Sequence, residues 1–288
     1  MTFDQMIKRL DALNAKQGLN PEVTPHGRNL RFQLERHDEK KRSMYERIFK
    51  GYMEMRNVKY NVSLRDYIKK IVACANSYLD LFWPKSPFPH QADFASSVMP
   101  EMLGIVFSSV IAERNIPLDV SAEADLIIEC AFSASGGGVL MSKNKRVDLA
   151  VVRRCELDFN GSKIDLPVPL ISIECKTNLD KNMLSGIEQS VADLKKTFPT
   201  CSYFVVSELS DFDVSKSNYA SSGIDEIFIL RRQKRGVVRS NPSERNAMDP
   251  ELVFELAKRL QDNIDLMQRP RELLSARMLN GKLIGRNS

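Results

Sequence analysis

Apolar residues recur at helical spacing in the first part of the chain. Between residues 1 and 17 they lie three and four positions apart, a spacing that predicts an amphipathic helix. Residues 18–29 contain several turn-forming residues and predict a connector. A charged helical pattern then runs over residues 30–57. The chain therefore begins with helices rather than strands.

A further helix is predicted over residues 63–82. Ser63 is a suitable N-cap, and apolar residues at helical spacing follow it on one face. Three prolines then occur within residues 83–90, and proline does not fit the interior of a helix. We predict a domain boundary there, with a helical region over 1–85 and a second region over 90–288.

The second region mixes helical and strand patterns. Residues 94–114 predict a helix that begins or bends near Pro100, whereas residues 124–132 fit either a strand or the end of a buried helix. Gly136, Gly137 and Gly138 predict a loop before a strand. Asn160-Gly161 then separates two strand-like runs, which is a strong hairpin signal.

An amphipathic helix over 178–198, strands at 201–207 and 225–232 and a final helix over 249–279 complete the pattern. Asp249 and Pro250 are typical of a helix start. These elements predict a mixed α/β (α+β) fold, with a central mixed β-sheet flanked by helices and an N-terminal helical subdomain.

Charge is unevenly distributed. The chain of 288 residues has a formal net charge of +5, and its first 70 residues hold 16 Lys and Arg against 9 Asp and Glu. Such an excess is typical of a protein that binds a polyanion, although a solvated helical surface with mixed charges explains it equally well.

Cysteine usage and apolar patterning indicate a cytoplasmic protein that does not cross a membrane. The five cysteines are scattered without a CxxC pair and there are three histidines, so we expect reduced thiols and no zinc site. No apolar stretch approaches the roughly 20 residues that cross a bilayer, and the N-terminus has no signal-peptide core.

The segment Ile171-Ser172-Ile173-Glu174-Cys175-Lys176-Thr177 places two charges in an apolar strand. If Asn160-Gly161 forms a two-residue turn, one bulged residue near the prolines at 167 and 169 brings Asp148 opposite Glu174. Strand alternation then places Asp148, Glu174 and Lys176 on one side of the sheet.

Two adjacent carboxylates repel each other unless a cation neutralises them. Hard oxygen ligands suit Mg2+, and a metal that polarises a phosphoryl oxygen and activates water supports phosphodiester hydrolysis. Lys176 is suited to orient the water or to stabilise charge on the phosphate. We therefore interpret Asp148, Glu174 and Lys176 as a metal-dependent nuclease site.

Asp148 followed by Glu174-Cys175-Lys176 resembles the D…(D/E)xK signature of the PD-(D/E)xK nuclease superfamily, although Val147 stands where the namesake pattern has proline. The order of elements over 94–207 is also similar to that family's core. The resemblance implies that Asp148 and Glu174 bind Mg2+ and that Lys176 assists catalysis. Many members add an acid from the preceding helix, for which Glu101 is the nearest candidate.

Simpler explanations remain for these residues. Acidic-x-Lys triplets also occur at Asp38, Glu39 and Asp193, in charged helical stretches where we expect solvated faces. Glu174 and Lys176 also fit a structural ion pair in an unrelated α/β protein. Glu101 fits equally well as a first-turn acid that interacts with the helix dipole.

Basic residues near these positions are the candidates for DNA contacts, mainly through phosphates. Three precede Asp148 closely, a second group lies in one basic run, and two belong to the N-terminal helices. They are Lys143, Lys145, Arg146, Arg231, Arg232, Lys234, Arg235, Arg28 and Arg31, with Arg239 at the end of the basic run.

The function predicted from these features is a Mg2+-dependent endonuclease acting on double-stranded DNA. Within the superfamily the size and the basic helical region favour a type II restriction endonuclease, and the organisation is similar to subunits of heterodimeric enzymes such as BbvCI. A double-strand break then needs a second subunit, in a homodimer or a heterodimer. The alternatives are a repair or recombination nicking nuclease and a non-catalytic DNA-binding or assembly subunit.

Overall fold

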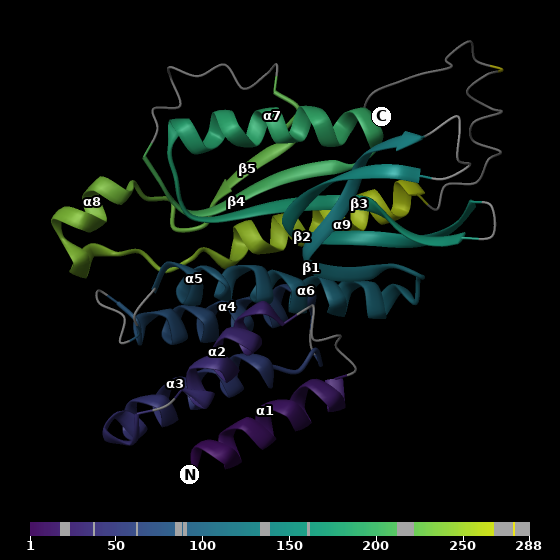
Figure 1. Ribbon diagram of the computed structural model, residues 1–288. Coiled ribbons are helices and arrows are strands. Elements are labelled where there is room, and N and C mark those ends of the chain that lie inside the picture. Colours follow the sequence, from purple (N-terminus) through teal and green to yellow (C-terminus); the bar gives the residue numbers. More distant parts are fainter. Residues whose placement is uncertain are drawn as a thin grey trace.

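The computed structural model describes residues 1–17, 24–36, 38–61, 63–83, 88, 91–132, 139–159, 162–211, 222–267 and 279. A five-stranded sheet lies between a helical layer built largely from the N-terminal part of the chain and the single helix α7 on its other face (Figure 1). This arrangement confirms the predicted mixed sheet flanked by helices.

The helices are α1 (Phe3–Gln17), α2 (Pro25–Glu35), α3 (Arg42–Arg56), α4 (Leu64–Asp80), α5 (Gln91–Ser96), α6 (Val98–Arg114), α7 (Lys181–Thr197), α8 (Arg235–Ser240) and α9 (Pro250–Met267). Short 3-10 turns occur at Glu39–Lys41 and Pro242–Glu244. The strands are β1 (Asp119–Phe132), β2 (Val139–Phe159), β3 (Ser162–Leu179), β4 (Ser202–Ser210) and β5 (Glu226–Ile229).

Local sequence signals account for several of these boundaries. The Ser63 side chain accepts a hydrogen bond from the Asp66 amide and caps α4, as predicted. Asp180 caps α7 in the same way through the Met183 amide. Proline at position 100 lies in the first turn of α6, where its missing N–H costs nothing.

Four details differ from the sequence expectations or complete them. Helix α2 begins at Pro25, inside the predicted connector, and the charged pattern over 30–57 is broken between Glu35 and Arg42. The open segment 124–132 is a strand. A short helix, α8, occupies part of the basic run that ends at Arg239. The glycine triplet 136–138, Asn160-Gly161, His37 and His90 lie outside the described residues.

The sheet has the order β1-β2-β3-β4-β5. β1, β2 and β3 pair antiparallel, whereas β3, β4 and β5 pair parallel. The parallel connection from β3 to β4 runs through α7, which covers the face of the sheet opposite the helical layer. β3 is therefore the strand at which the antiparallel and parallel parts of the sheet meet.

The pairing between β2 and β3 follows the predicted register. Phe159 pairs with Ser162 across the turn, and the register shifts by one residue between Val152, opposite Pro169, and Val151, opposite Ile171. Leu170 is the extra residue, so the bulge lies beside the prolines as expected. The last pair of the ladder, Leu149 with Ile173, places Asp148 and Glu174 at the next position on each strand.

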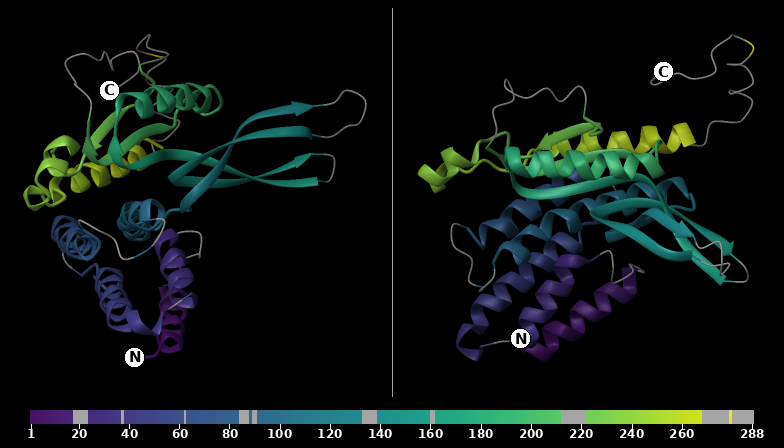
Figure 2. Two further views of the ribbon diagram at one scale, coloured as in Figure 1. Left: turned by 60° about the vertical axis from the view of Figure 1, so that its left-hand side comes forward. Right: turned by 45° about the horizontal axis from the view of Figure 1, so that its top comes forward.

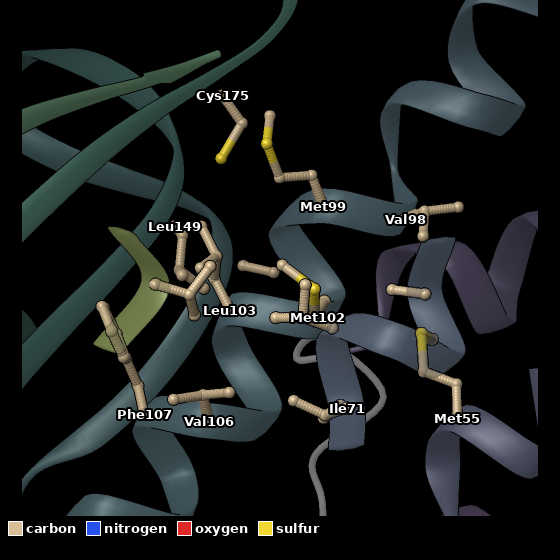
Figure 3. Close-up of a cluster of buried hydrophobic side chains, with 14 of the residues drawn as sticks. Met55, Ile71, Val98, Met99, Met102, Leu103, Val106, Phe107, Leu149 and Cys175 are labelled. Atoms are coloured by element: carbon tan, nitrogen blue, oxygen red, sulfur yellow. The ribbon is translucent and has the colours of Figure 1, made fainter. Parts of the chain in front are cut away.

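Two hydrophobic clusters hold the layers together. One joins the N-terminal helices, α6 and α9 to one face of the sheet, and Figure 3 shows Leu103 and Phe107 of α6 close to Leu149. The other lies between the opposite face and α7, with Leu184, Ile187, Val191 and Leu194 buried as the helical pattern predicted. The larger hydrophobic cluster extends from α1 to α9. It therefore contains residues from both sides of the predicted boundary at 83–90.

The β1–β2 ribbon changes faces near Asp148. Val147 belongs to the cluster beneath α7, whereas Leu149, two residues later, belongs to the cluster beneath α6. Glu123, which lies between the residues paired with Leu149 and Val147, has a φ of 51°. Beyond this point two β-hairpins extend from the sheet on the same side of the molecule (Figure 2).

The stretch Phe94–Arg114 passes the length and composition test for a membrane-spanning helix. The sequence expectation that no stretch comes close to this length was wrong in that respect. However, 72% of its most apolar window is buried inside the protein, as α6 lies between the sheet and the other helices. Burial of this kind is typical of a core helix.

Candidate active site

Asp148 and Glu174 lie at a fork in the sheet. The β2–β3 ladder ends at the pair Leu149 and Ile173; beyond it β2 continues beside β1, and β3 continues beside β4. The Asp148 carboxylate bridges the opening, since its Oδ2 accepts the Cys175 amide at 2.7 Å. Because β2 and β3 separate here, the Asp148 and Glu174 side chains are not brought into direct contact, as they would be in a continuous ladder.

The Lys176 ammonium lies between the two carboxylates. Its Nζ donates to Glu174 Oε1 at 2.7 Å and is 3.7 Å from Asp148 Oδ2. The three side chains are only partly exposed, at 29%, 13% and 35% for Lys176, Glu174 and Asp148. The structure therefore brings the three predicted residues together, with the Lys176 ammonium between the two carboxylates.

The charges of this cluster perturb one another. Burial and the negative charge of Glu174 raise the pKa of Asp148, while the charge of Lys176 opposes that shift. Burial alone would lower the pKa of Lys176, but its hydrogen bond to Glu174 and the charges of both carboxylates raise it. The site thus favours a cation between two acids.

Tyr203 on β4 contributes a contact that sequence reasoning missed. Its hydroxyl donates to Glu174 Oε2 at 3.2 Å, and its side chain is buried. Burial and the charge of Glu174 raise the pKa of the Tyr203 hydroxyl, which keeps it a proton donor. A tyrosine in an apolar strand carries no functional signal; only the parallel β3–β4 pairing brings it to Glu174.

The donor set fits a magnesium ion. Across the residues that the structure describes, no group of three or more His, Cys, Asp or Glu is arranged to hold a metal. Magnesium, however, is commonly bound through one or two carboxylates, with water and substrate phosphate completing its coordination. Asp148 and Glu174 already hold one cationic group, the Lys176 ammonium, so they are the residues that would hold the metal.

Glu101 is engaged elsewhere. It is fully buried, and its carboxylate accepts hydrogen bonds from the Gly27 amide at 2.9 Å, from the Tyr52 hydroxyl at 2.5 Å and from Arg56 at 2.8 Å. These partners belong to α2 and α3, in the helical layer, and not to the strands that carry Asp148 and Glu174. Glu101 was expected from the sequence to contribute to the metal site. Its carboxylate is instead taken up by the internal ion pair with Arg56, and none of these hydrogen bonds reaches Asp148 or Glu174.

The basic residues that precede Asp148 remain close to the site. The charge of Lys145 acts on Asp148 and opposes the increase in its pKa. Arg146 forms a bidentate pair with Asp125 at 2.8 and 2.9 Å, and Lys143 lies 3.6 Å from Asp193 on α7. Both pairs are solvent-exposed, so exchanging their carboxylates for phosphates costs little.

Arg28 reaches the same region from the helical layer. It forms an ion pair with Glu123 at 2.6 Å, beside the fork. A hollow of about 330 Å³ separates the two hairpins here, and its lining includes Arg28, Arg146 and Arg154. Arg154 was not predicted from the sequence. Arg146 and Arg154 lie toward opposite ends of β2, and only the tertiary structure shows that both line the same hollow.

The remaining basic candidates are divided between surface and core. Arg231 does not lie on the surface: it is 2% exposed, and its Nε donates to Glu208 at 2.7 Å. A buried arginine that stabilises the fold is not available to a phosphate. Arg232, Lys234, Arg235 and Arg31 retain solvent access, and Arg31 is paired with Asp11 and Glu35.

Residues 131–264 match the sequence model of the family described as Bpu10I restriction endonuclease. This match covers a little less than half of the chain and supports a type II restriction endonuclease. No match is found among curated proteins. The structure of the native BbvCI A2B2 tetramer contains a chain with the same fold: the TM-score is 0.69 and the identity 20%, over 88% of this chain and 99% of that one.

These comparisons confirm two predictions from the sequence. The chain has the mixed α/β fold that its periodicity indicated, and the structural resemblance to the BbvCI chain extends over most of its length. The matched range 131–264 also includes Asp148, Glu174, Lys176 and Tyr203. The fork therefore lies inside the segment that matches the family model.

Proposed function

We propose that the protein is a Mg2+-dependent endonuclease that hydrolyses phosphodiester bonds of double-stranded DNA, with one active site per subunit that cuts one strand. The observation that carries this proposal is the position of the Lys176 Nζ, 2.7 Å from Glu174 and 3.7 Å from Asp148, at the fork between β2 and β3. Two acids and a lysine in this arrangement can hold a cation and a phosphate together.

Each residue of the site has a separate role. Asp148 and Glu174 hold the metal, which when bound polarises the scissile phosphate and makes the attacking water more acidic. The Cys175 amide and the Tyr203 hydroxyl fix the orientation of the two carboxylates. Lys176 donates hydrogen bonds to the attacking water or to the phosphate oxygens, where negative charge develops.

DNA binding is assigned to basic residues on both sides of the fork. Lys143, Lys145 and Arg146 lie on the β1–β2 hairpin immediately before Asp148, and Arg28 reaches the fork from α2. The exposed ion pairs of Lys143, Arg146 and Arg28 hold these side chains in place until phosphates replace the carboxylates. The contact of Arg28 with Glu123 supports a DNA-binding role for the helical region 1–85.

A second subunit follows from the stoichiometry of the reaction. One site of this kind cuts one strand, so a double-strand break needs two sites. The BbvCI structure is described as an A2B2 tetramer, which supports a partner subunit for this chain, identical or homologous. We assign the enzyme to the cytoplasm, where its DNA substrate lies.

The test is cleavage of supercoiled plasmid by the purified protein with Mg2+, compared with Glu174→Ala and with added EDTA. We expect metal-dependent discrete fragments from the wild type and none from the variant. A matched control is Glu39→Ala, which alters an exposed acidic-x-Lys triplet and should cleave normally. Random nicking of undamaged plasmid would contradict sequence-specific restriction, and activity that survives EDTA would contradict the metal role.

A further inference from the structure

Asn178 is a buried amide that no protein group satisfies. The residue lies on β3 and is 7% exposed. Within the part of the chain that the structure describes, neither its Nδ2 nor its Oδ1 has a hydrogen-bond partner. An unsatisfied buried amide destabilises the folded state, so its presence needs an explanation other than stability.

The position of Asn178 relates it to the active site. Side chains alternate along a strand, so Glu174, Lys176 and Asn178 lie in one row on the same face of β3. The parallel register agrees, because Glu174 pairs with Val205, Lys176 with Ser207 and Asn178 with Leu209. Neighbours in such a row are about 6.6 Å apart along the strand, within reach of a flexible lysine side chain.

Metal binding creates a problem that Asn178 can solve. In the structure the Lys176 ammonium lies between the carboxylates that would hold the metal, 2.7 Å from Glu174. An ammonium and a divalent cation repel each other at such distances. Lys176 must therefore leave Glu174 when the metal binds, and a partly buried ammonium without an acceptor is costly.

We propose that Asn178 is a positioning residue whose Oδ1 accepts the Lys176 ammonium when a divalent cation takes its place between Asp148 and Glu174. The inference rests on the proposed function. Lys176 then has two positions: paired with the acids before metal binding, and held by Asn178 afterwards. In the second position it stays beside the scissile phosphate, and the Asn178 Oδ1 acquires the hydrogen bond that it lacks while Lys176 is paired with the acids.

The first experiment compares wild type with Asn178→Leu, which keeps a similar volume and removes both polar atoms. We expect the melting temperature of the metal-free protein to increase by about 2–6 °C, because an unsatisfied amide is lost. Binding of Mg2+ and of Ca2+, followed by calorimetry without DNA, should weaken about 10- to 100-fold, and cleavage should fall with it. Asn178→Asp, which retains an acceptor, should recover most of the affinity.

A matched control separates this role from ordinary packing. Asn76 on α4 has a satisfied side chain, whose Oδ1 accepts the Met248 amide at 2.9 Å and whose Nδ2 donates to the Met248 carbonyl. Asn76→Leu should lower the melting temperature and leave metal affinity and cleavage unchanged. The two substitutions should therefore change stability in opposite directions, and only Asn178→Leu should weaken metal binding and cleavage.

Coupling to Lys176 is measured in a Lys176→Met background, where no ammonium has to move. There Asn178→Leu should leave metal affinity unchanged. An equal loss in both backgrounds would overturn the proposal, as would an Asn178→Leu enzyme that binds metal and cleaves like wild type, or one that is less stable than wild type. If the wild type itself neither binds Mg2+ nor cleaves DNA, the proposed function fails instead.

Discussion

The carboxylate of Asp148 accepts the backbone amide of Cys175 at 2.7 Å, where β2 separates from β3. At a fork this amide has no ladder partner from β2, so the side chain replaces the missing backbone acceptor. The same residue thus closes the end of the ladder and presents an oxygen to the site. Structure and chemistry at Asp148 can be separated by choosing the substitution.

Asp148→Asn should fold like the wild type but lose metal-dependent cleavage. The amide oxygen can still accept from Cys175, whereas the charge that binds the cation is gone. Asp148→Ala should also lose activity, and in addition about 1–3 kcal/mol of unfolding free energy, because the Cys175 amide is left without its acceptor. Urea denaturation and plasmid cleavage distinguish the two; equal stability of the variants would contradict the structural role.

Tyr203→Phe removes the hydroxyl that orients Glu174 and keeps the buried ring. We expect about 10-fold weaker metal binding or cleavage, typical of the loss of a hydrogen bond to a metal ligand. Tyr67→Phe is a suitable control, since the Tyr67 hydroxyl contacts Ser109 in the helical layer. Cleavage by Tyr203→Phe at the wild-type rate would show that Glu174 is oriented without this contact.

Glu101→Gln should destabilise the protein by about 3–5 kcal/mol, because it leaves the fully buried Arg56 guanidinium without its counter-charge. The folded fraction should bind metal and cleave DNA normally, since the contacts of Glu101 are with α2 and α3. Thermal melting and calorimetry with Mg2+ measure the two properties separately. Weaker metal binding at unchanged stability would restore Glu101 as a ligand.

Acid sensitivity should arise in part at His26. Burial lowers its pKa from 6.5 to about 3, and its ring contacts the Phe94 carbonyl, Ser97 and Tyr78. Below pH 6.5 the unfolded chain takes up a proton that the folded protein excludes, so stability is complete above that pH and is lost as the pH falls toward 3. By pH 5 the loss should be roughly 2 kcal/mol. His26→Gln should show a smaller decrease between pH 7 and 5 in urea titrations.

The basic residues should fall into two classes. Arg146→Gln should weaken DNA binding and reduce its salt dependence while leaving the melting temperature within about 1–2 °C of wild type, because its pair with Asp125 is exposed. Arg231→Gln should instead lower stability measurably, since the buried Glu208 would lose one of its two guanidinium partners and keep only Arg245. Fluorescence anisotropy with duplex DNA at several salt concentrations measures the first effect.

The local rules of sequence were sufficient for much of this protein. Ser63 caps its helix as predicted, and the alternation around Asp148 and Glu174, with one bulge beside the prolines, determined the register of β2 and β3. These features depend on neighbours a few residues away or on a short hairpin. The clustering of Asp148, Glu174 and Lys176 could therefore be predicted from the chain alone.

Long-range packing decided the rest. Glu101 and Arg231 look like solvent-accessible charges in the sequence, but folding buries each against an opposite charge from a distant element. Tyr203 reaches Glu174 only because β4 pairs parallel to β3, and Arg28 reaches Glu123 across 95 positions of sequence. Local periodicity carries no information on such pairs, since burial of a charge depends on which partner the tertiary fold brings to it.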